Sequence, residues 1–305
     1  MNGFRADSMA DQSGRRVVIT GANSGLGFEA SLAFAAKGAR VTLACRNPER
    51  GETALARLRE ATGSTVCDVR PLDLASLDSV REFAAGWSEP LDVLINNAGL
   101  MATARATTAD GFEQQLGINH LGHFALNGLL LPALREAAAA RVVVVSSLAH
   151  KRGAINFDDL MSLSRYRRWR AYSQSKIANL YFAMEFARRL DARGEPLVVA
   201  AAHPGLANTN LPASMGRTGM GMVTSVFMRL MAQPGQWGVL PVLYAAAAPD
   251  VSNGDFYGPN GPGESRGDVT MVAPAARVAD LLVARRLWDV SEQLTGVTFA
   301  DLPPV

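Results

Sequence analysis

The sequence predicts an α/β fold in which helices cover both faces of a doubly wound parallel sheet. Five short apolar runs are continuous rather than alternating, which is typical of strands buried on both faces. Helical segments separate these runs from residue 16 to about residue 205. A glycine-rich turn joins the first run to the first helix, and sheets of this kind hold their ligands at such strand ends.

The expected strands are rich in β-branched and small apolar residues, and the segments between them have helical character. In chain order, the strands are expected at residues 17–19, 41–44, 93–95, 142–145 and 197–200, with a weaker candidate at 65–69. The helices are expected at residues 24–37, 49–62, 76–88, 110–138, 172–191, 237–248 and 275–295. The alternation stops after residue 205, and residues 253–263 are rich in Gly, Pro and Asn.

The length and composition favour one folded domain. The 305 residues fit a single α/β unit over residues 15–305, and residues 1–14 are expected to form a flexible tail. Hydrophobic residues make up 48% and charged residues 19%, which argues against disorder.

A net charge of +2 without a basic stripe argues against nucleic-acid binding. Two cysteines without zinc spacing predict neither a disulfide framework nor a metal site. With no apolar run long enough to cross a bilayer, the protein is expected to be cytoplasmic.

The turn after the first expected strand has the features of a phosphate-binding loop. Its sequence runs from Thr20 to Gly27 with glycines at 21, 25 and 27. Glycines allow a tight turn and a close approach to a pyrophosphate, whose charge the next helix N-terminus favours. The residues predicted to contact such a cofactor are Gly21, Asn23, Ser24, Gly25, Leu26 and Gly27. A glycine turn without a ligand remains the alternative.

The end of the second expected strand indicates which dinucleotide binds. A carboxylate usually occupies this position in NAD sites, where it binds the ribose 2′-hydroxyl. Here Cys45 stands at that place and is followed by Arg46 and Asn47. Because a guanidinium suits a 2′-phosphate, the sequence predicts NADP(H) in preference to NAD(H). The alternative is that Arg46 is an ordinary surface residue.

Polar side chains at two further places form a candidate reacting centre. Tyr172 and Lys176 lie four residues apart on one face of an expected helix. A nearby ammonium should favour the phenolate and lower the pKa of Tyr172, which would suit it to exchange a proton with a carbonyl or alcohol. Ser147 ends the 142–145 strand and could bind a substrate oxygen. Alternatively, the pair lies on a helix surface and the serine is a cap or turn residue.

Together these motifs resemble the short-chain dehydrogenase/reductase superfamily. Thr20–Gly27 resembles its TGxxxGxG cofactor motif, and residues 96–99 are identical to its NNAG motif. The resemblance adds contacts from Asp73 and Leu74 to adenine, and from Asn97, Ala98 and Gly99 to the cofactor. It also implies that Pro204, Gly205 and Thr209 wrap the nicotinamide. The family places its motifs in this order on a Rossmann fold.

The resemblance implies roles for four catalytic residues. Tyr172 would be the acid in reduction and the base in oxidation. Lys176 would bind the nicotinamide ribose and depress the pKa of Tyr172, and Ser147, rather than Ser146, would hold the substrate oxygen. Asn119, in the middle of an expected helix, would position a water in a proton relay that reaches Lys176.

Finer features resemble the branch that holds retinol dehydrogenases, WW-domain oxidoreductases and protochlorophyllide reductases. These features are residues 43–47, 145–150 and 203–205, together with a long interval between Ser147 and Tyr172. They imply an NADP(H)-dependent oxidoreductase that acts on a carbonyl or alcohol of a small lipophilic molecule. A catalytically silent NADP(H)-binding scaffold and a C=C reductase remain alternatives.

The resemblance also places a substrate lid at residues 206–235. This segment contains a methionine-rich stretch at 215–231, and flexible thioethers suit an adaptable apolar surface. Those methionines could instead belong to the permanent core or to a subunit contact. Relatives pair through the helix that carries Tyr172 and the long helix before it, so a homo-oligomer is left open.

Overall fold

The computed structural model describes residues 3–206, 235–299 and 302–304. Their central element is an eight-stranded sheet with the order β3-β2-β1-β4-β5-β6-β7-β8. All neighbouring strands are parallel except β7 and β8, which are antiparallel. The strands are β1 (Arg16–Thr20), β2 (Arg40–Cys45), β3 (Asp68–Pro71), β4 (Val93–Asn96), β5 (Arg141–Val145), β6 (Val198–Ala202), β7 (Phe256–Pro259) and β8 (Val269–Met271). The predicted doubly wound α/β fold is confirmed.

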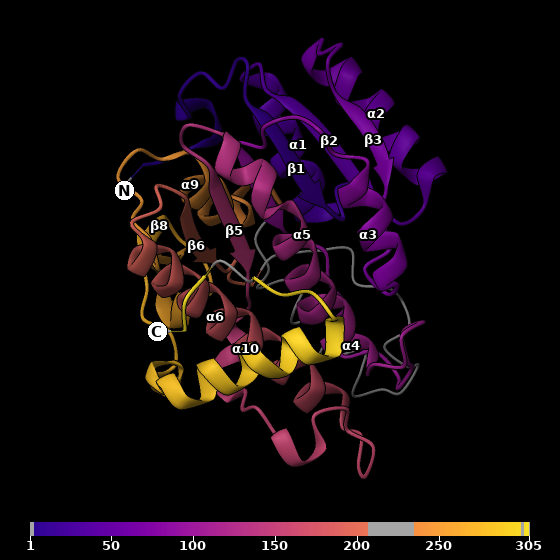
Figure 1. Ribbon diagram of the computed structural model, residues 1–305. Coiled ribbons are helices and arrows are strands. Elements are labelled where there is room, and N and C mark those ends of the chain that lie inside the picture. The colour runs from indigo at the N-terminus through magenta and orange to yellow at the C-terminus, as the bar shows by residue number, and fades with distance from the viewer. Residues whose placement is uncertain (1–2, 207–234, 300–301, 305) are drawn as a thin grey trace, which may run out of the picture.

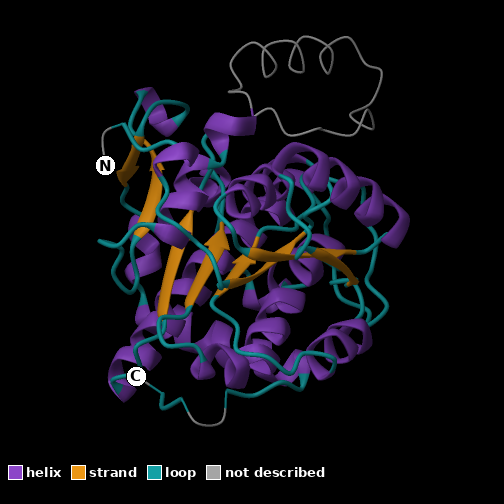
Figure 2. Cartoon of the chain, turned by 90° about the horizontal axis from the view of Figure 1, so that it is seen from above, coloured by secondary structure: helices purple, strands orange, loops and turns teal. Residues whose placement is uncertain are grey.

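Helices lie on both faces of the sheet, as the view along it shows (Figure 2). The helices are α1 (Gly25–Ala36), α2 (Pro48–Thr62), α3 (Leu77–Ala85), α4 (Gln114–Leu116), α5 (Gly122–Glu136), α6 (Arg168–Arg193), α8 (Gly235–Gly238), α9 (Leu240–Ala247) and α10 (Leu281–Thr295). Two cores result, one beneath α3, α5, α6 and α10, the other beneath α1, α2 and α9. In β1, Val18 faces the first core, whereas Val17 and Ile19 face the second. A strand buried on both faces therefore needs an unbroken apolar run.

Several element boundaries differ from those expected. The weak strand candidate lies at Asp68–Pro71 rather than 65–69, because its pairing with β2 begins at Thr42 and Asp68. The long helix predicted at 110–138 starts only at Gln114 and contains a π-helical turn at Gly117–Leu121. The last helix begins at Leu281, where the Asp280 side chain caps it. Strands β7 and β8 were not predicted, because the glycines and prolines around them dominate the local composition.

The structure places residues 3–14 against the domain, in place of the predicted flexible tail. Met9 is buried in the second core and only 3% exposed. The Phe4 ring contacts the Tyr244 ring edge-on at a centroid distance of 5.0 Å. Arg5 Nη1 lies 2.9 Å from Asp268 Oδ1. Apolar contacts, an ion pair and backbone hydrogen bonds, such as that from the Gln12 N–H to the Lys37 carbonyl oxygen, thus hold this mostly polar segment. Its average composition gives no sign of these contacts.

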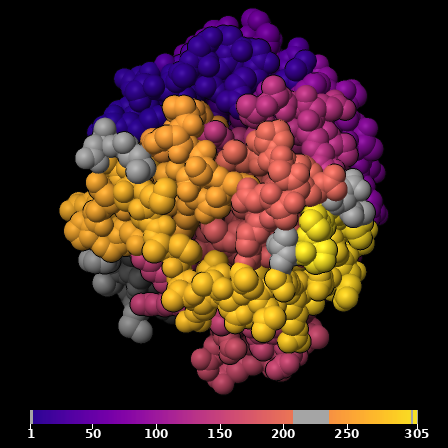
Figure 3. Space-filling view, turned by 60° about the vertical axis from the view of Figure 1, so that its left-hand side comes forward, coloured from indigo at the N-terminus to yellow at the C-terminus, as the bar shows by residue number. Residues whose placement is uncertain are grey.

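Helix α10 lies across the outside of α5 and α6 (Figure 1, yellow). Its Trp288 packs against Phe124 of α5 at 5.2 Å and Phe182 of α6 at 5.8 Å between ring centroids. Phe299, beyond α10, joins this aromatic cluster at 4.6 Å from Trp288. The yellow residues of α10 form part of the outer surface in Figure 3. Across the described residues, no helix is both long enough and apolar enough to span a membrane.

Candidate active site

The carboxyl ends of β1, β2, β4, β5 and β6 open into one cleft of about 820 Å³. It brings together most of the predicted site residues. Those that line it are Gly21, Asn23, Ser24, Gly25, Leu26, Arg46, Asp73, Leu74, Asn97, Ala98, Gly99, Ser147, Tyr172, Lys176, Pro204 and Gly205. Residues as far apart in the chain as Gly21 and Gly205 thus meet because these strands all point the same way.

The glycine turn brings the N-terminus of α1 to one end of the cleft. Gly21 and Gly25 have φ values of +66° and +57°, which favour glycine. Gly27 lies just behind the turn, where a Cβ would come within 2.6 Å of the Gly21 carbonyl oxygen and 2.5 Å of Asn97 Nδ2. A Cβ at Gly25, by contrast, would meet no described atom within 4 Å. The turn is therefore closely packed against Asn97 at Gly27 but has open space beside Gly25. This arrangement fits a pyrophosphate at the helix N-terminus.

Thr20 connects this turn to the neighbouring strand, a role that the sequence analysis did not identify. Its Oγ1 accepts hydrogen bonds from the backbone N–H groups of Asn97 and Ala98, both at 2.9 Å. It lies 2.8 Å from His123 Nε2, and His123 Nδ1 lies 3.1 Å from the Asn119 carbonyl oxygen. One buried histidine thus links the glycine turn to Asn119. The only sequence signal was the position of Thr20 at the end of the first strand.

The cofactor-specific end of the cleft contains Arg46. The second predicted residue there, Asn47, is not part of the cleft wall: its side chain accepts from the Arg50 N–H at 2.8 Å and caps α2. Cys45 is buried, and burial raises its pKa to about 11, so it remains a neutral thiol. No carboxylate therefore follows β2 immediately, and the exposed guanidinium of Arg46 is the charged group at this strand end.

Tyr172, Ser147 and Lys176 meet near the middle of the cleft. The Ser147 hydroxyl lies close enough to that of Tyr172 to favour its phenolate form. Lys176 Nζ donates to the Val145 carbonyl oxygen at 3.1 Å and lies 6.0 Å from the centroid of the Tyr172 ring. Ser146 also lines the cleft, but its hydroxyl donates to the Lys176 carbonyl oxygen at 2.9 Å and so holds α6 against β5. The hydroxyl of Ser147 is the one directed at Tyr172.

The protonation of this centre differs from the expectation. Burial raises the pKa of Tyr172 above its ordinary value, and the neighbouring Ser147 hydroxyl offsets this only in part. Burial also lowers the pKa of Lys176, to about 8. The predicted lowering of the Tyr172 pKa by Lys176 is thus not found, because burial is the largest influence on this phenol and raises its pKa. In this structure Tyr172 is a neutral phenol.

Asn119 lies behind the cleft wall, in the π-helical turn. Its Oδ1 accepts from the Leu100 N–H at 2.7 Å, and its Nδ2 donates to Ser175 Oγ at 2.9 Å. A Cβ at Gly99 would lie 3.1 Å from Asn119 Oδ1 and 3.5 Å from Lys176 Nζ. The extra residue of the π turn explains how an asparagine is accommodated within a long helical segment. Gly99 thus lies between the side chains of Asn119 and Lys176.

Apolar side chains also line the cleft. They are Leu100, Met101, Leu148, Trp169 and Leu206, none of which the sequence analysis identified. Trp169 is 47% exposed, and its ring lies 6.1 Å from that of Tyr172. Its position three residues before Tyr172 on a helix was the available signal. Thr209 and almost all of the predicted lid at 206–235, including the 215–231 stretch, lie outside the described residues.

Comparison with known proteins identifies the family. Residues 15–218 match the family model described as short chain dehydrogenase. The chain belongs to the short-chain dehydrogenase family. It is 41% identical to human retinol dehydrogenase 13 over 97% of this chain and 89% of that protein. Mouse polyprenol dehydrogenase is 37% identical over 98% of this chain and 89% of that protein. The chain therefore lies in the retinol dehydrogenase-like branch.

Solved structures agree with this assignment. An uncharacterized protein from Mycobacterium paratuberculosis has 43% identity and a TM-score of 0.82, over 97% of this chain and 99% of that one. A short-chain dehydrogenase of Shigella flexneri, solved with NADP, has the same fold at 24% identity and a TM-score of 0.61, over 80% of this chain and 96% of that one. The family binds a nicotinamide cofactor and interconverts alcohols and carbonyls, so this short-chain dehydrogenase is an oxidoreductase of that kind.

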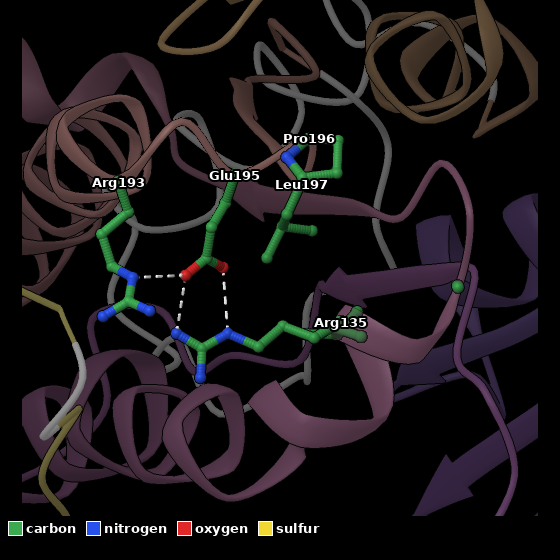
Figure 4. A pocket seen from close by; sticks show the side chains of 7 residues that line it. Arg135, Arg193, Glu195, Pro196 and Leu197 are labelled. Atoms are coloured by element: carbon green, nitrogen blue, oxygen red, sulfur yellow. Dashed lines mark hydrogen bonds and ion pairs between the residues drawn. The ribbon is translucent and has the colours of Figure 1, made fainter.

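A second, smaller pocket of about 320 Å³ lies beside the amino end of β6, at the edge of the sheet opposite the cleft (Figure 4). Glu195 forms ion pairs there with Arg135 at 2.8 Å and Arg193 at 3.1 Å. Leu134, Ala137, Pro196 and Leu197 complete the lining. The ion pairs join the end of α5 to the segment that enters β6, a structural role. Within the described ranges, no group of three or more potential metal-ligating side chains occurs.

Buried histidines should make the stability of this short-chain dehydrogenase depend on pH. Burial lowers the pKa of His120 to about 3 and that of His123 and His203 to about 4. Between these values and 6.5 the unfolded chain binds more protons than the folded one, so stability falls as the pH is lowered. We expect up to about 1.4 kcal/mol lost per pH unit for each histidine below pH 6.5.

Urea unfolding at pH 7, 6 and 5 would measure this loss. His120→Gln should show a shallower decline, because one of the buried histidines with a lowered pKa is then absent. A free energy of unfolding that stays constant from pH 7 to pH 5 would contradict the prediction.

Proposed function

We propose that this short-chain dehydrogenase transfers hydride between NADP(H) and a carbonyl/alcohol pair of a small lipophilic molecule. The observation that carries the proposal is that Tyr172, Ser147 and Lys176 meet on the wall of one cleft, which also contains the glycine turn. Two neighbouring hydroxyls on one cleft wall can both bind one substrate oxygen. A proton can then pass to or from that oxygen.

Each residue has a separate task in this proposal. When bound, the cofactor supplies or accepts the hydride at the substrate carbon. Ser147 holds the substrate oxygen, and Tyr172 donates a proton to it in reduction and takes one back in oxidation. Because burial raises its pKa, Tyr172 rests in the protonated form that reduction requires. Lys176 binds the ribose of the cofactor, and Asn119 supports the proton path to Lys176 from behind Gly99.

The remaining predicted residues hold the cofactor. The turn at Gly21–Gly27 takes the pyrophosphate, and Asp73 with Leu74 takes the adenine. Asn97, Ala98 and Gly99 form the wall between them and Lys176. Pro204 and Gly205 cover the nicotinamide end, and we propose that Thr209 and the 206–235 segment contribute there too.

The apolar lining of the cleft supports a lipophilic substrate. Leu100, Met101, Leu148 and Trp169 offer contact area there and few hydrogen-bonding groups. The names of the relatives, retinol and polyprenol dehydrogenases, also favour a lipophilic substrate.

The direct test of the proposed function is a screen of aliphatic, aromatic, retinoid and steroid carbonyls with NADPH, with the products identified. Turnover without carbonyl loss would instead indicate a C=C reductase. Cofactor binding without any turnover would indicate a silent scaffold.

Arg46 should determine the choice of cofactor. We expect NADPH to bind more tightly than NADH, because a guanidinium pairs with the 2′-phosphate that NADH lacks. Arg46→Ala should weaken NADPH binding about 10–100-fold, the worth of a charge-assisted hydrogen bond, and leave NADH binding nearly unchanged. Fluorescence titration of both proteins with both cofactors measures this. Arg50→Ala, on the outer surface of α2, is the matched control. Equal affinity of the wild type for the two cofactors would remove Arg46 from this role.

A further inference from the structure

A chain of polar contacts centred on Glu264 borders the cleft. Glu264 Oε1 accepts from Lys151 Nζ at 2.7 Å, and Glu264 Oε2 lies 3.1 Å from His203 Nε2. On the other side of the ring, the Gly205 N–H donates to His203 Nδ1 at 3.1 Å. We call these four residues the Glu264 relay. It joins the loop after β7 to the loop after β5, which contains Ser147, and to the loop after β6.

These contacts define the protonation of the His203 ring. Because Nδ1 accepts from a backbone N–H, it carries no proton. Nε2 must then be the N–H that donates to Glu264. The ring is fully buried, and burial holds the pKa of His203 at about 4, which keeps it neutral. A Cβ at Gly258 would clash with His203 Nε2. The absence of a side chain at this position therefore provides the space that the His203 ring occupies. The Glu264 carboxylate thus favours the Nε2–H tautomer of His203, in which Nδ1 is free to accept the hydrogen bond from the Gly205 N–H.

The backbone around Glu264 is strained. Glu264 has a φ of 56°, in the left-handed region that non-glycine residues rarely adopt. Gly263 beside it also has a positive φ, of 61°, and lines the cleft. The Ser265 carbonyl oxygen accepts from the Leu206 N–H at 2.8 Å, a second bond from this loop to the segment after β6. Strain of this kind persists only where the surrounding contacts impose it, and it concentrates at functional sites.

We propose that Glu264 is a positioning residue: through the Nε2–H tautomer of His203 it fixes the Gly205 backbone in the wall of the cleft. This inference rests on the proposed function, in which Pro204 and Gly205 cover the nicotinamide end of the cofactor. Glu264 also pairs with Lys151, but that side chain is 42% exposed, whereas the His203 ring is fully buried, so the contact with His203 is the more buried of the two. Without the carboxylate, His203 could adopt the Nδ1–H tautomer, which would repel the Gly205 N–H.

Glu264→Gly tests this role because it removes the carboxylate and relieves the backbone strain at once. We expect an unchanged or higher melting temperature together with about tenfold weaker NADPH binding. Glu264→Gln, which keeps an acceptor oxygen for His203, should restore most of the affinity. Ser162→Gly is the matched control, since Ser162 also has a positive φ, of 50°, but does not line the described cleft. It should bind NADPH like the wild type.

A second readout needs no cofactor. The chain has only four histidines, so ¹⁵N spectra of histidine-labelled protein can report each tautomer. The wild type and Glu264→Gln should show His203 as the Nε2–H form, whereas Glu264→Gly should show a mixture or the Nδ1–H form. An unchanged tautomer, or unchanged NADPH affinity, in Glu264→Gly would overturn the positioning role alone. A wild type that binds no NADP(H) would contradict the proposed function as well.

Discussion

Tyr172→Phe should lower kcat by about 10²–10⁴-fold, the usual worth of a positioned acid-base group. The change removes one oxygen, and with it the proton that the substrate oxygen receives in reduction. The ring stays, so its packing against Trp169 and the shape of the cleft should be kept. The dissociation constant for NADPH should therefore change little. Steady-state kinetics with any accepted carbonyl, together with a fluorescence titration of the cofactor, would measure both effects.

Tyr181→Phe provides the control for this experiment. Tyr181 lies on the same helix, but its hydroxyl donates to the Arg277 carbonyl oxygen at 2.7 Å, away from the cleft. Its loss should cost stability without lowering kcat. Full activity in Tyr172→Phe would remove this residue from the reaction. An equal loss in both variants would show that the effect comes from a disturbed helix.

Gly27→Ala should abolish most of the NADPH affinity and also destabilise the fold. The new Cβ would lie 2.5–2.6 Å from Asn97 Nδ2 and the Gly21 carbonyl oxygen, so the turn and the 96–99 segment must move apart. Overpacking of this kind costs about 1–3 kcal/mol in the free energy of unfolding. Because the turn itself holds the pyrophosphate in the proposed site, we expect NADPH binding to weaken more than tenfold.

Gly63→Ala separates the two effects of that substitution. Gly63 ends α2 with a φ of +69°, and a Cβ there would meet no described atom within 4 Å. Alanine at this position is strained and should lower stability by about 1 kcal/mol, with no change in NADPH affinity. Urea unfolding and cofactor titration of both variants give the comparison. Normal cofactor binding by Gly27→Ala would mean that the turn does not hold the pyrophosphate.

The sequence was sufficient to predict the first six strands of the sheet and most of the cleft because both depend on local patterns. Val17–Ile19 is apolar throughout since both of its faces are buried, and the glycines that follow it are required by positive φ values or close contacts. The carboxyl ends of parallel strands then bring Arg46, Ser147 and Gly205 together without further information.

Long-range contacts account for what could not be predicted. The link from Thr20 through His123 to Asn119 depends on how α5 packs beneath the sheet. The Glu264 relay joins three loops, and no spacing in the chain reveals it. The direction of the Tyr172 pKa shift also required the structure, because helical spacing gives the nearness of Lys176 but not the extent of burial.

The aromatic packing beneath α10 bears on which surfaces of this chain are open to other molecules. The faces of α5 and α6 that carry Phe124 and Phe182 are covered by Trp288 and Phe299 of the same polypeptide. The C-terminal helix thus buries those faces from within the chain. A partner docking on them would first have to detach this helix and expose five aromatic rings to water.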